Sequence, residues 1–212
     1  MIDKWFETSA EARKLKAHIL QYFGPLECVY IERARTYLGV PVMVLLLRPT
    51  EKRPYQLLVT IGLSHLKMTV PEQLQGYGLD YAELIMAVPA EWSVDEGNWA
   101  VQWLAETAQL AEREKAWLGW GYTSEIKKPT DSDFKGILLM LPDEFDPKAA
   151  VCRVNERDDV HFYQVAPLYP EELAFAQANG AAALMERFDG AFSPVVNVRR
   201  KNYAVECQNS EV

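Results

Sequence analysis

Short continuous runs of apolar residues alternate with amphipathic stretches along this chain, and the runs predict buried strands. The two strongest runs are residues 42–47, which prolines bound, and residues 82–88, which Pro89 ends. A continuous apolar run of this length is typical of a strand covered on both faces. A short polar turn separates 42–47 from a further run at 56–63, which predicts an antiparallel hairpin.

Two stretches have the periodicity of amphipathic helices, 8–23 and 97–117. Apolar residues recur three and four positions apart in each, so that each helix has one apolar face. The tryptophans of the second helix allow two interpretations, a stripe that faces the core and an aromatic groove for a partner peptide. We favour the core, because most amphipathic stripes face one. Two pairs have capping-box spacing: Thr8 with Glu11, and Ser93 with Glu96.

Later runs predict strands at 134–141, 160–166 and 194–198, and Pro167 and Pro170 introduce a helix that Gly180 ends or bends. Hairpin-length connections indicate antiparallel pairs, and connections through helices allow parallel ones. We therefore expect a mixed α/β (α+β) fold: a single domain with a central, mixed, largely antiparallel sheet and helices on both faces. The domain is expected over 1–203, with a flexible acidic tail at 204–212.

Composition and charge argue against several classes of protein, among them nucleic-acid binders, disulfide-rich proteins and membrane proteins. The chain has 212 residues and a net charge of -8, whereas a general nucleic-acid binder needs excess lysine and arginine. The three cysteines are too few and too scattered for a disulfide framework or a zinc site. The N-terminus lacks a signal-peptide pattern, and the longest apolar run is too short to span a bilayer. We expect a reduced, cytoplasmic protein without membrane contact or cofactor.

Candidate catalytic residues are present, but not in a motif that would supply a mechanism. Ser64-His65 lacks the GxSxG pattern of a nucleophile elbow, and Cys152 with His161 would need a lowered thiol pKa. Metal-binding motifs and phosphate-binding loops are absent from the sequence. We expect no enzymatic activity. A hydrolase-type enzyme that uses either pair remains an alternative, as does a self-associating structural protein.

Binding residues are predicted from aromatic side chains that border predicted turns, where burial is less obligatory. These are Trp92, Tyr122, Tyr163 and Tyr169. One basic cluster, Arg199-Arg200-Lys201, could meet an acidic partner. We favour a solvated chain end for this cluster, since exposed charges usually contribute little.

Several stretches in chain order, from about residue 25 to 190, together resemble the suppressor-of-fused domain family. The order and spacing of the pieces carry the resemblance, because each piece alone is weak. The pieces are Thr60-Ile61-Gly62-Leu63-Ser64, Met68, Pro71, Glu83-Leu84, Pro89, Trp92, Trp99, Leu118-Gly119, Gly136-Ile137-Leu138, Pro142, residues 162–169, Glu171-Glu172-Leu173, Gly180 and Leu184.

The resemblance implies a non-enzymatic, protein-binding domain. Animal members of the family hold Gli-type transcription factors with two domains that clamp an extended peptide, and this chain is similar to the N-terminal domain of that pair. Its size is similar to that of stand-alone bacterial members, some of which act as immunity proteins that neutralise toxin domains. The expected partner is a protein, and the acidic surface would steer a basic one, such as a nuclease toxin.

Overall fold

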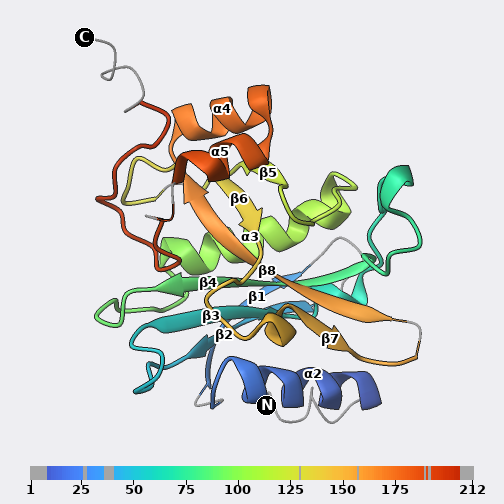
Figure 1. The fold of residues 1–212 in the computed structure, drawn as a ribbon. Coiled ribbons are helices and arrows are strands. Elements are labelled where there is room, and N and C mark those ends of the chain that lie inside the picture. Colours follow the sequence, from blue (N-terminus) through green and yellow to red (C-terminus); the bar gives the residue numbers. More distant parts are fainter. Residues whose placement is uncertain are drawn as a thin grey trace.

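The computed structural model describes residues 9–25, 28–35, 41–128, 130–156, 158–188, 190 and 192–205. Within them the strands form one sheet of eight, whose spatial order is β1-β2-β3-β4-β8-β6-β5, with β7 paired to β8 (Figure 1). The strands are β1 (Cys28–Arg35), β2 (Pro41–Leu47), β3 (Gln56–Ile61), β4 (Tyr81–Val88), β5 (Thr123–Glu125), β6 (Gly136–Met140), β7 (Val151–Arg153) and β8 (Asp159–Leu168).

Strand pairing follows the expected mixed, largely antiparallel pattern. β2 pairs antiparallel with β3, which confirms the predicted hairpin. β4 and β8 are parallel, and the other paired strands are antiparallel. A parallel pair needs a long crossover, and here the crossover runs through α3 (Trp99–Arg113) and the strands that follow it.

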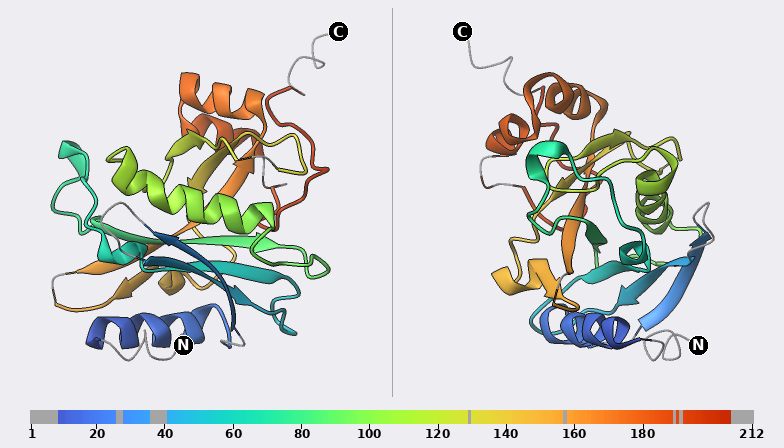
Figure 2. Two further views of the ribbon diagram at one scale, coloured as in Figure 1. Left: turned by 180° about the vertical axis from the view of Figure 1, so that it is seen from behind. Right: turned by 90° about the vertical axis from the view of Figure 1, so that its right-hand side faces the viewer.

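Helices cover both faces of the sheet (Figure 2), as the sequence predicts. Alternate residues of β2 show why, because successive side chains of a strand point to opposite faces. Val42, Val44 and Leu46 belong to the core beneath α3, whereas Met43, Leu45 and Leu47 belong to the core beneath α2 (Ala10–Tyr22).

The tryptophans of α3 face the core, which confirms the favoured interpretation of that stripe. Trp99 and Trp103 are 6% and 0% exposed and pack edge to face, with ring centroids 5.3 Å apart. A third core lies under α4 (Pro170–Asn179) and α5 (Ala181–Phe188). No described helix is long and apolar enough to cross a membrane.

Both predicted capping boxes differ from the observed caps. Thr8 lies outside the described residues, and Ser9 caps α2, its hydroxyl accepting from the Ala12 amide at 3.0 Å. The box at Ser93 is wrong, because α3 begins later, where the side chain of Asn98 accepts from the Ala100 amide at 2.9 Å. An asparagine next to the first helical turn satisfies a free amide that a serine five residues earlier cannot reach.

The strand predicted at 194–198 is wrong, since only one isolated bridge forms there. β4 and β8 pair as far as Ile85 and Gln164, so the end of β4 is left without that neighbour. The Val196 amide then donates to the carbonyl of Ala87 at 2.9 Å, within a parallel bridge between Ala87 and Val195. This single bridge provides a hydrogen-bond partner for the backbone at the end of β4, and no further strand forms.

The basic cluster is not a solvated chain end, because Arg200 is an internal cation. Its guanidinium forms two hydrogen bonds with the Glu172 carboxylate, of 2.6 and 2.5 Å, and another with the Pro167 carbonyl at 2.8 Å. The side chains of Arg200 and Glu172 are 10% and 0% exposed. Four rings surround the guanidinium, those of Phe134, Tyr169, Phe192 and Tyr203. The pair therefore fastens the C-terminal segment to α4.

Replacing Arg200 with methionine would leave the Glu172 carboxylate buried without its cation. We expect the free energy of unfolding to fall by about 3–5 kcal/mol, as is typical when a buried ion pair loses one partner. Arg199→Met is the matched control, since Arg199 is exposed, and its effect should stay within about 0.5 kcal/mol. Urea unfolding followed by tryptophan fluorescence measures both variants. Equal losses would contradict a specific role for the ion pair.

Candidate functional site

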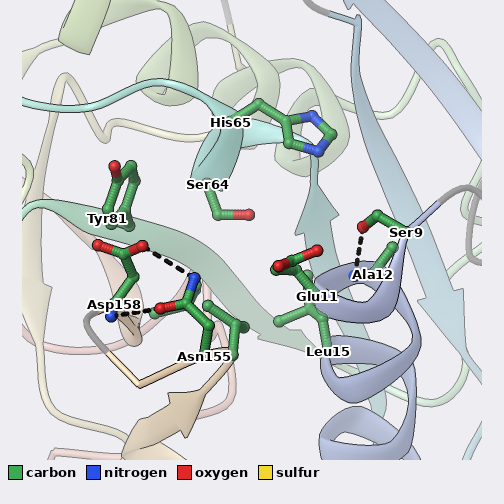
Figure 3. Close-up of a pocket in the computed structure, with 11 residues that line it drawn as sticks. Ser9, Glu11, Ala12, Leu15, Ser64, His65, Tyr81, Asn155 and Asp158 are labelled. Atoms are coloured by element: carbon green, nitrogen blue, oxygen red, sulfur yellow. Dashed lines mark hydrogen bonds between the residues drawn. The ribbon is translucent and has the colours of Figure 1, made fainter.

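A cavity of about 400 Å³ opens where β3 ends and β4 and β8 begin, between α2 and the short helix η1 (Leu63–His65) (Figure 3). α2 contributes its first turns, η1 contributes two polar side chains, and the turn before β8 closes the other side. The lining residues are Ser9, Glu11, Ala12, Leu15, Ser64, His65, Tyr81, Val154, Asn155, Asp158 and Val160.

Two carboxylates stand on opposite walls of this cavity. Hydrogen bonds from the backbone amide and from Ser9 lower the pKa of Glu11, so this side chain is charged at neutral pH. Asp158 accepts from the Asn155 amide nitrogen at 2.9 Å and donates its own backbone amide to the Asn155 oxygen at 2.9 Å (Figure 3). These reciprocal bonds hold the turn in one conformation. The walls therefore suit a cationic group.

Behind the cavity lies Glu83, a fully buried carboxylate on β4. One of its oxygens accepts from the Gly62 amide at 2.9 Å, the Ser64 amide at 3.1 Å and the Ser64 hydroxyl at 2.7 Å. The other oxygen accepts from the Thr60 hydroxyl at 2.7 Å. Gly62 has a φ of 109°, which a residue with a side chain rarely adopts. The chain can therefore turn sharply after β3 and present its amides to Glu83.

Burial raises the pKa of Glu83 to about 7, against the hydrogen bonds of Ser64 and Thr60, which lower it. The surroundings can accommodate the proton, because the Thr60 oxygen accepts from the Leu84 amide at 2.7 Å and lies 3.4 Å from the Leu84 carbonyl. When Glu83 is protonated it can donate to Thr60, whose own hydroxyl then turns to that carbonyl. Glu83 therefore holds the turn that carries Ser64 on the cavity wall, and its carboxyl can exchange a proton while it does so.

The predicted Ser64-His65 pair is not arranged as a nucleophile and its base. Ser64 donates its hydroxyl to Glu83, and the same carboxylate oxygen also holds two backbone amides. Burial lowers the pKa of His65. The arrangement is that of a carboxylate that stabilises a tight turn, with Ser64 as one of its donors.

Cys152 and His161 do not meet either. In the antiparallel pair of β7 and β8, Cys152 lies opposite Val160, and His161 lies opposite Val151. Directly opposed residues share a face and their neighbours take the other face, so Cys152 and His161 point to opposite sides of the sheet. Burial raises the pKa of the Cys152 thiol to about 11, the opposite of what a nucleophile requires. No three His, Cys, Asp or Glu side chains among the described residues could hold a metal ion.

The four predicted contact aromatics lie on different elements, away from this cavity. Trp92 and Tyr122 are half-buried against the α3 core. Tyr163 is only 4% exposed, and the Tyr169 hydroxyl donates to the Arg200 carbonyl at 2.7 Å. Their role in partner contact stays a prediction. All four belong to or pack against the core beneath α3.

Sequence reasoning missed Tyr77, which is 74% exposed. It stands between Gly76 and Gly78, which both have positive φ angles, of 85° and 72°. The carbonyl of Gly78 lies 3.1 Å from the His161 ring nitrogen, which places this loop beside the first residues of β8. Because neighbouring residues of a strand take opposite faces, His161 lies on the other face of the sheet from Val160, which lines the cavity. The sequence signal was the Gly-Tyr-Gly triplet, where an aromatic residue occupies a turn.

Glu83→Gln tests whether the buried carboxyl of Glu83 titrates, because the amide resembles the protonated acid and cannot lose its proton. The pKa of Glu83 in the folded state lies above the ordinary value of 4.5, so the folded protein binds this proton more tightly than the unfolded chain does. The stabilisation that the proton provides is fully present below pH 4.5 and is lost as the pH rises through about 7. We expect the stability of the wild type relative to Glu83→Gln to fall by about 3 kcal/mol from pH 4.5 to pH 8.

Urea unfolding of both proteins across this pH range measures the difference, and the contribution of the histidines, which both proteins share, cancels in it. A difference that stays constant with pH would contradict a titrating Glu83. A difference that rises with pH would mean that Glu83 is anchored as a carboxylate with a depressed pKa.

Comparison with known proteins finds relatives of this chain by sequence and by fold. Residues 39–201 match the family "Suppressor of fused protein (SUFU)". An uncharacterized protein from Ureaplasma parvum serovar 3 is 25% identical over 201 residues, which cover 93% of this chain and 98% of that protein.

Solved structures share the fold at low sequence identity. A SUFU homologue from Neisseria gonorrhoeae is 17% identical with a TM-score of 0.64, over 92% of this chain and 94% of that one. The Sufu–Fu complex gives 15% identity and a TM-score of 0.63, over 92% of each chain. Drosophila Suppressor of Fused is 15% identical with a TM-score of 0.53, over 77% of this chain and 42% of that chain. By its sequence match and its fold, this chain belongs to the suppressor-of-fused protein family.

Proposed function

We propose that this protein is a non-enzymatic, cytoplasmic binding domain that sequesters or neutralises a basic partner protein, as an immunity protein does with a toxin. The observation that carries the proposal is the cavity with Glu11 and Asp158 on facing walls, backed by a turn that Glu83 anchors. The similar Sufu–Fu complex supports it, because a protein of this fold there assembles with another protein.

The cavity suits the side chain of a lysine or arginine from the partner. Neither Glu11 nor Asp158 forms an ion pair within the described part of the chain, although the charges of Lys14 and Arg13 reach Glu11 and help to lower its pKa. The hydrogen bonds between Asn155 and Asp158 order one wall in advance. A site that is already ordered loses less entropy on binding.

Tyr77 would supply a separate apolar contact, on the loop that meets the start of β8 from the other face of the sheet. Tyrosine is enriched among the residues that dominate binding energy, since it offers a large amphipathic surface with few rotatable bonds. The glycines on either side permit the sharp turn, because they adopt positive φ angles, and the Tyr77 ring at this turn is exposed. The net charge of -8 would speed the encounter with a basic protein through long-range attraction.

The test uses the tagged protein as bait in lysate of its native source, with bound proteins identified by mass spectrometry. We expect a stoichiometric basic protein, held less tightly as salt rises. The purified pair is then measured by calorimetry with the double variant Glu11→Gln/Asp158→Asn and with Tyr77→Ala. Each should weaken the affinity at least about tenfold, which is about 1.4 kcal/mol.

The matched control is Glu125→Gln/Asp131→Asn, which removes the same charge from exposed positions on the β5 side of the sheet. We expect this control to change the affinity less than about twofold, because exposed, distant charges contribute little. An empty bait at every salt concentration would overturn the proposed function. Equal weakening by the cavity variant and the control would overturn the assignment of the site.

A further inference from the structure

A second cavity, of about 340 Å³, lies between the end of β6, helix α5 and the segment that follows it. It shares no residue with the cavity of Glu11 and Asp158. We call it the methionine cleft. Its lining residues are Met140, Leu141, Asp143, Glu144, Gln164, Met185, Phe188, Gly190, Phe192 and Pro194.

The interior of the methionine cleft is largely apolar, apart from the buried amide of Gln164. Phe188 is 3% exposed and stacks on Phe192, with ring centroids 4.5 Å apart and planes 16° from parallel. Met140 and Met185 are half-buried on its walls. Methionine is unbranched and polarizable, so its side chain adapts to guests of different shape and contacts aromatic rings favourably. The cleft can therefore enclose an apolar side chain without a precisely matched shape.

The rim of the cleft is negative. Asp143 and Glu144 are both exposed there, and neither forms an ion pair within the described part of the chain. Leu141, beside them, is 43% exposed. Burial, with a smaller contribution from the charge of Asp143, raises the pKa of Glu144 to about 7, so a cation at the rim would favour the charged form of this carboxyl. An apolar interior beside two adjacent carboxyl groups therefore favours an occupant that carries positive charge around an apolar residue. A second copy of this chain, with its own charge of -8, is a poor fit to such a rim.

We propose that the methionine cleft is a docking site for one apolar side chain, aromatic or unbranched, on a positively charged segment of a partner protein. The proposal extends the proposed function, since a basic partner would contact both this cleft and the first cavity. The two contacts are separable, because the cleft can be tested with a short peptide and without the partner.

The probe is a capped pentapeptide in which one phenylalanine is flanked by two lysines on each side. The protein is labelled with ¹³C at the methionine ε-methyl groups, and each signal is assigned by a Met→Leu variant. We expect the signals of Met140 and Met185 to shift in a saturable manner. Those of Met43 and Met86, which are 5% and 0% exposed within the sheet, should not move. Serine in place of phenylalanine, or glutamate in place of the lysines, should each abolish the shift.

The variant Asp143→Asn/Glu144→Gln should weaken the binding of this peptide at least fivefold. The variant Glu11→Gln/Asp158→Asn, at the other cavity, should leave the binding unchanged. The proposal is overturned if the two methionine signals do not move, or if the glutamate peptide shifts them equally. Methionine signals that move with protein concentration alone would point to a second copy of the chain and would also overturn it. An empty bait in lysate, by contrast, would contradict the proposed function while leaving a peptide response intact.

Discussion

The buried carboxylate of Glu83 is the interaction on which the candidate site depends. An unpaired charge in a protein interior costs several kcal/mol, and here two hydroxyls and two backbone amides surround it. The amides come from Gly62 and Ser64, in the turn after β3. The carboxylate is therefore tolerated because the turn takes one conformation, and the turn in that conformation places Ser64 and His65 on the cavity wall.

The sheet determines where cavities can form. Helices α2 and α3 cover its two faces (Figure 2), and the two cavities described above open at strand ends. One opening lies where β4 and β8 begin, and the other lies past the end of β6. The pair of Arg200 and Glu172 fastens the C-terminal segment against α4, and that segment supplies Phe192 and Pro194 to the methionine cleft. Both openings carry carboxylates, as the proposed binding of one basic partner requires.

Part of the site could have been predicted from the sequence, and part could not. Glu83 is the one charge inside the apolar run 82–88, and a charge in such a run indicates a buried polar cluster. Nothing local indicated that Gly62 and Ser64 would be its donors, because they come from a different strand end. Similarly, Arg199, Arg200 and Lys201 are chemically alike in sequence, and only packing distinguishes the buried Arg200 from the exposed Arg199.

The sequence by itself determined the hairpin of β2 and β3, the core-facing tryptophans of α3 and the mixed sheet with helices on both faces. These follow from periodicity, which is local along the chain and directly readable. The tertiary structure alone decided which carboxylates meet which donors, why Cys152 and His161 face apart, and where the two cavities open. The register and order of the strands set those relations, and no local pattern encodes them.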